Sequence, residues 1–268
     1  RAQLRGGVPV DARTEVSGAP VPGRVALVTG GTRGIGAAVT RQLAADGIRV
    51  AAAYARDDDR AAQLIAELST AGAVPVSAYR CDISDQAACR DLVKRVVSEH
   101  GSLDYLVNNA GLLQEQRVDR IEPADWHRAL EVNLSGPFYL AQAAWEHMVA
   151  RRFGRIVNVS SVTAFTGNSR ETAYGAAKAG LLGLTRSLAL AGARRAITVN
   201  CVVPGVFATD MTASMSERDQ ETILGMIPLG RHGRPDELAH AIRFLLDDRS
   251  GYITGAVLVV DGGLSMGT

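Results

Sequence analysis

Short apolar runs alternate with longer segments of helical periodicity from residue 24 almost to the end of the chain. The apolar runs are rich in β-branched residues and alanine, which is typical of strands buried on both faces of a sheet. The predicted strands are Arg24–Thr29, Ile48–Tyr54, Val74–Tyr79, Leu103–Asn108, Arg155–Ser160, Ile197–Val203 and Ala256–Val260. The predicted helices are Gly34–Asp46, Asp58–Ala71, Ser84–His100 (capped by Ser84), Glu122–Val132, Leu134–Ala150, Thr172–Ala191 and Asp236–Leu246. This alternation predicts an α/β fold in which helices flank one doubly wound, parallel sheet of about seven strands.

The pattern predicts one folded domain preceded by an extension. No linker or internal repeat interrupts the alternation, and a chain of 268 residues is long enough to bury a full core. We therefore assign residues 23–268 to a single domain. Residues 1–22 are rich in glycine, proline, valine and charge without a period, and we interpret them as a flexible N-terminal extension. Partner binding or an oligomer contact is the alternative for this segment.

Composition and charge exclude several classes of function. The formal net charge is +1 and 47% of the residues are hydrophobic, so no strong field for a nucleic acid or a membrane surface is expected. No apolar run is long enough to span a bilayer, and residues 1–22 contain no apolar signal core, which favours a cytoplasmic protein. Cys81, Cys89 and Cys201 have no metal-binding or redox spacing, so we expect small core residues and no metal site.

Tyr174 and Lys178 are the first candidates for chemistry. Residues four apart lie one turn apart on the same face of a helix. An unperturbed tyrosine has a pKa of about 10, and a fixed lysine cation nearby favours the phenolate, so we expect Lys178 to lower the pKa of Tyr174. Ser161, just upstream, offers a hydroxyl that could orient a carbonyl or alcohol oxygen toward the phenol. A Tyr-x-x-x-Lys spacing also occurs by chance in many helices, so the other motifs of the chain must show whether this pair is functional.

A glycine-rich turn, Thr29–Gly36, joins the first predicted strand to the first predicted helix. Its spacing is Gly-x-x-x-Gly-x-Gly, not the commoner Gly-x-Gly-x-x-Gly of dinucleotide-binding proteins. Glycines allow a tight turn and a close approach of the backbone to a pyrophosphate, and the helix N-terminus supplies amide donors. Ordinary loop chemistry is the alternative interpretation.

Taken together, these motifs resemble the short-chain dehydrogenase/reductase family over Gly23 to Met266. The motifs that match, in the family's order and spacing, are Thr29–Gly36, Asn108–Gly111, Asn133, Ser161, Tyr174, Lys178 and Pro204–Gly205. Within the family, the segments Pro204–Met211, Ile227–Arg231 and Tyr252–Gly263 are most similar to 3-oxoacyl-[acyl-carrier-protein] reductases. The resemblance implies a Rossmann-type fold and an NADP(H)-dependent ketoreductase.

The resemblance also implies a role for each catalytic candidate. Tyr174 would donate the proton during reduction, Ser161 would hold the carbonyl oxygen, and Lys178 would bind the nicotinamide ribose. Asn133 would hold a helix bend and a water that relays protons to Lys178. Ser160 competes with Ser161, but the family's serine lies thirteen positions before the tyrosine, which selects Ser161.

Other positions would line the cofactor by the same resemblance. Besides Tyr174 and Lys178, they are Gly30, Thr32, Arg33, Gly34, Ile35, Gly36, Tyr54, Arg56, Asp82, Ile83, Asn109, Ala110, Gly111, Pro204, Gly205, Phe207 and Thr209. An acidic residue at the end of the second strand would favour NAD, but Tyr54 stands there. Arg33 and Arg56 near the same ribose favour the 2′-phosphate of NADP(H). Alternatively, Arg56 is a solvated charge among neighbouring aspartates, which would also weaken a phosphate site.

The expected substrate is a 3-oxoacyl thioester carried by an acyl carrier protein of fatty acid or polyketide synthesis. Carrier proteins are acidic, and the resemblance aligns Arg152 and Arg195 with arginines that dock them near the mouth of the site. Helix C-termini also attract arginines to complement the dipole, which is the alternative for both. Leu112–Gln116 departs from the Thr-Arg-Asp segment usual in carrier reductases, so the pocket edge suits an unusual acyl or polyketide chain.

Two other functions stay open. One is an oxidoreductase that acts on a free sugar, steroid or cyclic ketone, and the other is a non-catalytic scaffold that only binds the cofactor. The serine, tyrosine and lysine argue against the scaffold. Family members are commonly homotetramers, and Gly180 and Gly183 would allow close helix contact in one. By resemblance, residues 206–230 form the substrate lid.

Overall fold

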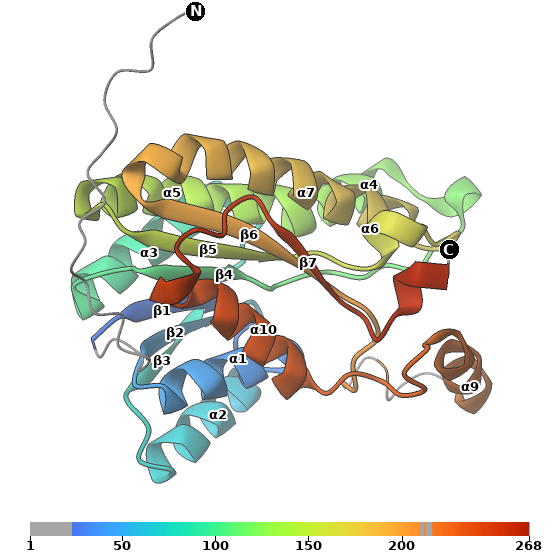
Figure 1. Cartoon of the computed structure of the whole chain (residues 1–268), viewed down its shortest axis with the longest axis horizontal. Helices are drawn as coiled ribbons and strands as arrows, with labels where there is room; N and C mark the ends of the chain where they lie inside the picture. The colour runs from blue at the N-terminus through green and yellow to red at the C-terminus, as the bar shows by residue number, and fades with distance from the viewer. Residues whose placement is uncertain (1–22, 210–211, 213–215, 268) are drawn as a thin grey trace, which may run out of the picture.

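The computed structural model of the chain describes residues 23–209, 212 and 216–267. The expected N-terminal extension, residues 1–22, lies outside the described residues. At the centre is a seven-stranded sheet in the order β3-β2-β1-β4-β5-β6-β7 (Figure 1). Its strands are β1 (Val25–Thr29), β2 (Arg49–Tyr54), β3 (Val76–Arg80), β4 (Tyr105–Asn108), β5 (Gly154–Val159), β6 (Ile197–Pro204) and β7 (Val257–Val260). All neighbouring strands pair in parallel, so the predicted doubly wound fold is confirmed.

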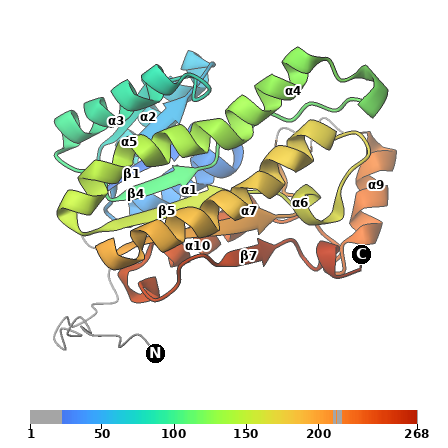
Figure 2. The same ribbon diagram turned by 90° about the horizontal axis from the view of Figure 1, so that it is seen from above.

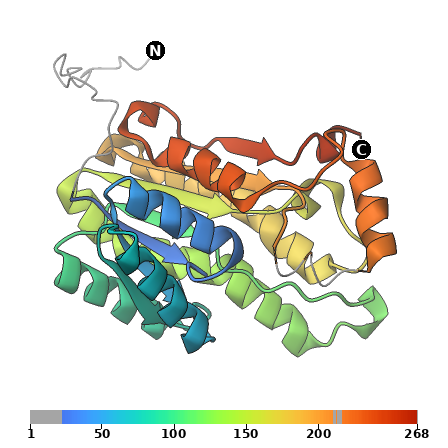
Figure 3. The ribbon, with the colours of Figure 1, turned by 90° about the horizontal axis from the view of Figure 1, so that it is seen from below.

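Helices cover both faces of this sheet. One face carries α3 (Gln86–His100), α5 (Gly136–Arg151) and α7 (Thr172–Gly192), which Figure 2 shows from above. The opposite face carries α1 (Gly34–Ala45), α2 (Asp58–Thr70) and α10 (Pro235–Leu246), seen from below in Figure 3. Each layer buries its own apolar cluster against the sheet. The strands are therefore covered on both sides, which is why they appear in the sequence as nearly continuous apolar runs.

The strand order creates a crevice at the carboxyl edge of the sheet. β1 lies between β2 and β4, so the chain crossings reverse direction at this point. In an open parallel sheet such a reversal leaves a crevice beyond the carboxyl ends of the strands, where ligands bind. The two central strands that end there belong to the buried core, since Leu27, Val28, Leu106 and Val107 are fully buried.

Shorter elements complete the fold. They are α4 (Pro123–Leu130), the π-helical turn η2 (Glu131–Ser135), α6 (Thr163–Thr166), α9 (Glu217–Met226) and the 3₁₀ turns η1 (Val118–Arg120), η3 (Ala193–Arg195), η4 (Asp248–Ser250) and η5 (Leu264–Gly267). The sequence pattern did not predict α6 or α9. α6 is a single turn, and α9 starts at a cap in which the Ser216 hydroxyl accepts from the amide of Asp219 at 3.2 Å.

Two helix boundaries differ from the prediction. Ser84 does not cap α3; Asp85 does, because its carboxylate accepts from the amides of Ala87 and Ala88 at 2.7 and 3.2 Å. Ser84 instead donates to the Asp82 carboxylate at 2.8 Å. The predicted separation of two helices around residue 133 is a π-helical turn, η2, so α4 and α5 continue through a bulge rather than a break.

Cys81, Cys89 and Cys201 are buried free thiols, as expected of small core residues. Within the described part of the chain, no helix combines the length and apolarity needed to cross a membrane. The same residues contain no group of three or more His, Cys, Asp or Glu side chains placed to hold a metal ion.

Candidate active site

Tyr174 and Lys178 lie at the carboxyl edge of the sheet, where the sequence motifs converge. α7 carries both side chains on one face, and it packs beside α6 and over β6. The Lys178 ammonium lies 5.6 Å from the centre of the Tyr174 ring. Ser161 lies two residues beyond the end of β5 and close enough to Tyr174 to affect the pKa of its phenol. The structure therefore brings the three predicted side chains into one cluster.

Lys178 is a buried cation. Its side chain is 3% exposed, and its Nζ donates to the main-chain carbonyl of Val159 at 2.8 Å. Burial lowers the pKa of Lys178 to about 8. An ammonium has three donors, and this carbonyl accepts from one of them. A Cβ at Gly111 would lie 3.4 Å from Nζ, so the glycine leaves space beside the ammonium.

The pKa of Tyr174 departs from the sequence prediction. Burial raises it to about 12, while the nearby Ser161 hydroxyl acts in the opposite direction and the Glu171 charge adds to the rise. The expectation that Lys178 lowers this pKa is therefore wrong for the structure described here. Desolvation of the phenolate outweighs a lysine that is itself desolvated and turned toward Val159. The phenol stays protonated at neutral pH, which suits a proton donor.

The structure separates the two competing serines. Ser160 is 2% exposed and its hydroxyl donates to the main-chain carbonyl of Lys178 at 2.8 Å. This bond fastens β5 to α7 and turns Ser160 away from the crevice. Ser161 is partly exposed, so of the two serines it is the accessible one, and its contact with a substrate oxygen stays a prediction.

Asn133 lies in the π-helical turn, and it is fully buried. Its Nδ2 donates to the carbonyls of Leu112 and Ala129, both at 2.9 Å, and its Oδ1 accepts from the amide of Leu112 at 3.0 Å. Asn133 thus joins the bulge to the segment that follows β4. The predicted helix bend is present, whereas the water relay to Lys178 stays a prediction.

The glycine turn faces the exit of β6. Gly30 and Gly34 have φ values of +61° and +52°, which favour glycine, and α1 begins at Gly34. A Cβ at Gly34 would meet only Thr209 within 4 Å, at 3.7 Å. Gly36 packs so closely on the carbonyl of Gly30 that no side chain fits there. The first turn of α1 therefore presents open backbone to the crevice, with Thr32, Arg33 and Ile35 around it.

The segment Asn109–Gly111 has a structural task of its own. Thr29 Oγ1 accepts from the amides of Asn109 and Ala110, each at 3.0 Å, and Asn109 Nδ2 donates to the Thr29 carbonyl at 2.9 Å. These bonds hold the ends of β1 and β4 together. The open helix N-terminus and the buried Lys178 ammonium fit the pyrophosphate and ribose hydroxyls of a nicotinamide dinucleotide.

The part of the predicted cofactor site that would bind the adenosine ribose contains a charged residue, Arg80, that the sequence analysis did not name. The Tyr54 hydroxyl donates to Asp58 at 2.8 Å, and Arg80 lies 3.6 Å from the same carboxylate. Arg80 was missed because only the pairing of β2 with β3 sets it opposite Tyr54. Arg33 and Arg56 are exposed, and neither has an ion-pair partner among the described residues. Both guanidinium groups are free to meet a phosphate.

Asp82, at the end of the predicted cofactor site that would hold the adenine, is held by hydrogen bonds from α4. Asp82 accepts from Arg128 at 2.9 Å, and Arg128 also contacts the hydroxyl of Ser84. These hydrogen bonds lower the pKa of Asp82 against the effect of its burial. Ile83 is 5% exposed and packs against Gly136. Arg128 is a further residue that sequence reasoning missed, because its partner is distant along the chain.

The exit of β6 carries the predicted cofactor-binding residues Pro204, Gly205, Phe207 and Thr209. Pro204 and Gly205 end the strand, and the Pro204 carbonyl accepts from the Val162 amide at 2.9 Å. Phe207 is 5% exposed and its side chain belongs to the core, so its role in binding the cofactor stays a prediction. Thr212 fixes the following turn by accepting from the Thr209 amide at 2.9 Å. The remainder of the predicted lid includes residues 210–211 and 213–215, which lie outside the described residues.

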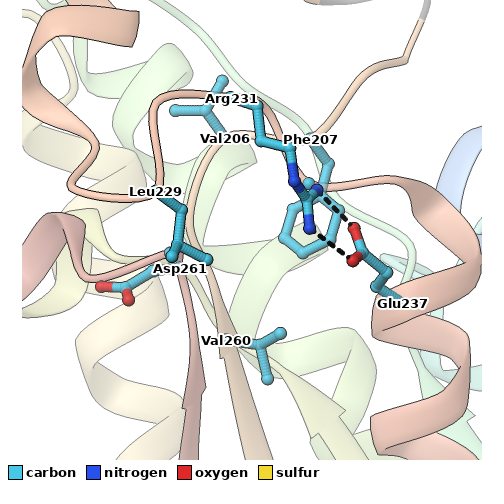
Figure 4. Close-up of a pocket in the computed structure, with 9 residues that line it drawn as sticks. Val206, Phe207, Leu229, Arg231, Glu237, Val260 and Asp261 are labelled. Carbon is cyan, nitrogen blue, oxygen red and sulfur yellow. Dashed lines mark hydrogen bonds and ion pairs between the residues drawn. The ribbon is translucent and has the colours of Figure 1, made fainter.

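Phe207 also lines a small cavity of about 100 Å³ (Figure 4). Arg231 crosses one wall and forms an ion pair with Glu237 at 2.7 Å. The other residues that line the cavity are Val206, Leu229, Gly233, Val260, Asp261 and Gly262. Ser161, Tyr174 and Lys178 are not among them, so this cavity is separate from the candidate active site.

Arg152 and Arg195 lie at the other edge of the sheet. Arg152 caps α5 just before β5, Arg195 ends η3 just before β6, and Arg152 donates to the carbonyl of Arg194 at 3.4 Å. Together with Arg151, these residues form one exposed basic patch at the amino ends of β5 and β6. Ser161 follows the carboxyl end of β5. The expectation that the two arginines flank the mouth of the site is thus wrong within a single chain.

Comparison with known proteins gives consistent matches. A family model described as Enoyl-(Acyl carrier protein) reductase matches residues 30–265. The chain is 42% identical over 241 residues to an acetoacetyl-CoA reductase from Shinella zoogloeoides, covering 90% of this chain and 98% of the relative. It is 40% identical, with the same coverage, to the 3-oxoacyl-[acyl-carrier-protein] reductase FabG of Staphylococcus aureus.

Solved structures agree with these relatives. A putative gluconate dehydrogenase from Agrobacterium tumefaciens matches with a TM-score of 0.87 at 33% identity, covering 91% of this chain and 96% of that chain. A double mutant of a short-chain dehydrogenase/reductase from Serratia marcescens matches with a TM-score of 0.85 at 37% identity, covering 92% and 99%.

Proposed function

The chain belongs to the short-chain dehydrogenase/reductase family and is an oxidoreductase that acts on C=O or CH–OH groups with NADP(H), and we propose that it reduces a 3-oxoacyl thioester to the 3-hydroxyacyl thioester. The observation that carries this proposal is the cluster of Ser161, Tyr174 and Lys178 opposite the open N-terminus of α1. The relatives' names support a 3-oxoacyl group as the substrate class.

In the proposed reaction, each residue acts on one atom. The Tyr174 phenol, protonated at neutral pH, donates its proton to the carbonyl oxygen as the alcohol forms. Ser161 donates a hydrogen bond to the same oxygen and fixes its position. Lys178 holds the ribose hydroxyls with the donors that Val159 leaves free. When bound, NADPH supplies the hydride. Asn133 keeps the Leu112 segment and the helix bulge in place around the lysine.

The preference for the phosphorylated cofactor is assigned to Arg33 and Arg56. Both are exposed, Arg33 in the glycine turn and Arg56 two residues after Tyr54, and β2 ends on Tyr54 rather than on an acidic residue that would bind ribose hydroxyls. Asp58 is engaged by the Tyr54 hydroxyl and Arg80, which reduces its repulsion of a phosphate. Guanidinium groups bind phosphate through charge-assisted hydrogen bonds.

The acyl carrier is proposed to be a protein rather than coenzyme A, and its docking surface to be the basic patch of Arg151, Arg152, Arg194 and Arg195. The patch lies across the sheet from Tyr174 of its own chain, so it would serve a site on another subunit of a homotetramer. Gly183 supports such an assembly, because a Cβ there would meet nothing within 4 Å in its own chain. Gly180 does not, since it packs against Leu134 of the same chain.

The first experiment follows NADPH oxidation with acetoacetyl thioesters of acyl carrier protein, coenzyme A and N-acetylcysteamine, with NADH in parallel. A 2-enoyl thioester is included because the family model's description names enoyl reductases. We expect turnover of the 3-oxoacyl substrates and none of the enoyl one. A lower KM for the carrier-protein form, lost in Arg152→Ala and Arg195→Ala but kept in Arg95→Ala, would support the docking patch.

The alternative is an oxidoreductase of a free sugar, steroid or cyclic ketone. One matched structure is titled a putative gluconate dehydrogenase, so sugar acids belong in the substrate panel. Turnover of a free ketone or alcohol without turnover of any thioester would overturn the proposal. Absence of all turnover would favour the non-catalytic scaffold. A cytoplasmic location stays a prediction.

A further inference from the structure

Glu171 is connected to the proposed catalytic serine by a chain of hydroxyl groups. It lies at the N-cap of α7, one turn before Tyr174, and is half-buried. Its Oε2 accepts from Thr163 Oγ1 at 2.9 Å, and Thr163 Oγ1 in turn accepts from Ser161 Oγ at 3.3 Å. Neither Glu171 nor Thr163 was singled out by the sequence motifs, because the link depends on α6 turning back onto α7.

The chain of hydrogen bonds has a direction that the carboxylate imposes. An ionised carboxylate only accepts, so it takes the single proton of Thr163. Thr163 Oγ1 can then only accept, and it draws the hydroxyl proton of Ser161 toward itself. The Thr163 amide already donates to Ser161 Oγ at 3.3 Å. The one proton that Ser161 can offer a substrate oxygen is therefore shared with Thr163.

We propose that Glu171 is a positioning residue that acts through Thr163 to set whether Ser161 donates its proton to the substrate oxygen. With a neutral group at position 171, Thr163 accepts from that group and turns its own proton to Ser161 Oγ. Ser161 then donates to the substrate. With ionised Glu171, the hydroxyl chain runs the other way and competes with the substrate. The proposal rests on the proposed role of Ser161.

The groups around Glu171 set the pH at which its carboxylate becomes protonated. Burial and the charge of Glu115 raise the pKa of Glu171, and the Thr163 hydrogen bond acts against them. Glu115 is itself ion-paired with Arg170 at 3.8 Å, and the remaining titratable neighbour on α7 is Tyr174. Asp125 of α4 is engaged by Gln116 at 2.9 Å, whose backbone pairs with Glu171.

Asn168 makes Glu171→Gln an informative variant. Its Nδ2 donates to Oε1 of Glu171 at 2.8 Å. This contact requires an oxygen, so a glutamine at position 171 would place its amide nitrogen opposite Thr163. Glu171→Gln therefore imitates the protonated acid at every pH. Thr163→Val removes the relay, and Thr163→Ser, which keeps the hydroxyl, is the matched control.

The test measures kcat and KM against pH for the wild type and these three variants, with any ketone that the wild type turns over. We expect the wild-type kcat to fall about threefold to tenfold as pH rises through the ionisation of Glu171, the range for one hydrogen bond. Glu171→Gln and Thr163→Val should lack this fall, Thr163→Ser should keep it, and KM for NADPH should not change. A fall that persists in Glu171→Gln would overturn the proposal.

A second measurement needs no substrate, so it separates this proposal from the proposed function. The ¹³C carboxyl signal of Glu171, assigned by its loss in Glu171→Gln, is titrated in the wild type, Thr163→Val and Thr163→Ser. Removing the Thr163 donor should raise the pKa of Glu171 in the valine variant alone. Equal pKa values in all three proteins would show that the relay is not formed and would overturn the proposal.

Discussion

The ammonium of Lys178 donates to the main-chain carbonyl oxygen of Val159, 2.8 Å away, although the lysine side chain is only 3% exposed. Burial lowers the pKa of Lys178 to about 8 in the folded chain, from the ordinary lysine value of 10.5. Between these two values the unfolded chain binds more protons than the folded chain. The stability contributed at this position therefore rises with pH across that window.

The first prediction follows from this pair. Between pH 7 and 9.5, the free energy of unfolding of the wild type should rise by about 2 kcal/mol relative to that of Lys178→Met. Urea unfolding of both proteins across this range measures the difference, and groups shared by the two proteins cancel. The upper limit avoids the ionisation of tyrosines. A difference that is constant with pH would mean that Lys178 is not desolvated.

Removal of the Tyr174 hydroxyl should abolish proton donation while sparing the fold. We expect Tyr174→Phe to lose about 10²- to 10⁴-fold in kcat, the usual contribution of a general acid, with unchanged binding of NADPH by fluorescence titration. Tyr105→Phe is the control. Tyr105 is 3% exposed, burial also raises its pKa to about 12, and its hydroxyl has no hydrogen-bond partner in the described part of the chain. Equal losses in both variants would contradict the assignment.

Asn133 should be required for both stability and turnover. Asn133→Ala leaves the amide of Leu112 and the carbonyls of Leu112 and Ala129 without their partner, which should cost about 2–4 kcal/mol in the free energy of unfolding. The same variant should lower kcat, because the Leu112 segment lies beside Lys178.

Asn158→Ala separates these two effects. Asn158 is also fully buried, and it donates to Thr185 and accepts from Asn108 at 2.9 and 2.8 Å. This variant should be destabilised to a similar extent and keep the kcat of the folded enzyme. Thermal denaturation and kcat per folded molecule distinguish the two asparagines. A similar loss of kcat in both would reduce Asn133 to a purely structural residue.

Arg33 and Arg56 should control the choice of cofactor. Each substitution to alanine should raise KM for NADPH about tenfold to a hundredfold and leave KM for NADH unchanged, since a hydrogen bond to a charged group contributes about 1.5–3 kcal/mol. Arg41→Ala is the control, because Arg41 is an exposed arginine held by Glu67 at 2.7 Å. Parallel changes for both cofactors would assign the two arginines to general attraction rather than to the 2′-phosphate.

The sequence by itself determined the architecture and the candidate residues of the active site. Period-two and period-3.6 patterns are local properties, so the strands buried on both faces and the helices between them were predictable within a few residues. The motif order identified Ser161, Tyr174, Lys178 and the glycine turn. Topology then requires that segments following parallel strands meet at one edge, which is why residues far apart along the chain form one site.

The tertiary structure decided what depends on neighbours distant along the chain. Only packing shows that Ser160 is tied to the Lys178 carbonyl, that Asp85 rather than Ser84 caps α3, and that the Phe207 ring is in the core. The pKa of Tyr174 rises because desolvation exceeds the influence of a lysine turned toward Val159. Desolvation depends on every atom around a group, and the direction of a hydroxyl proton depends on its one acceptor. Neither is encoded in the spacing of residues along a chain.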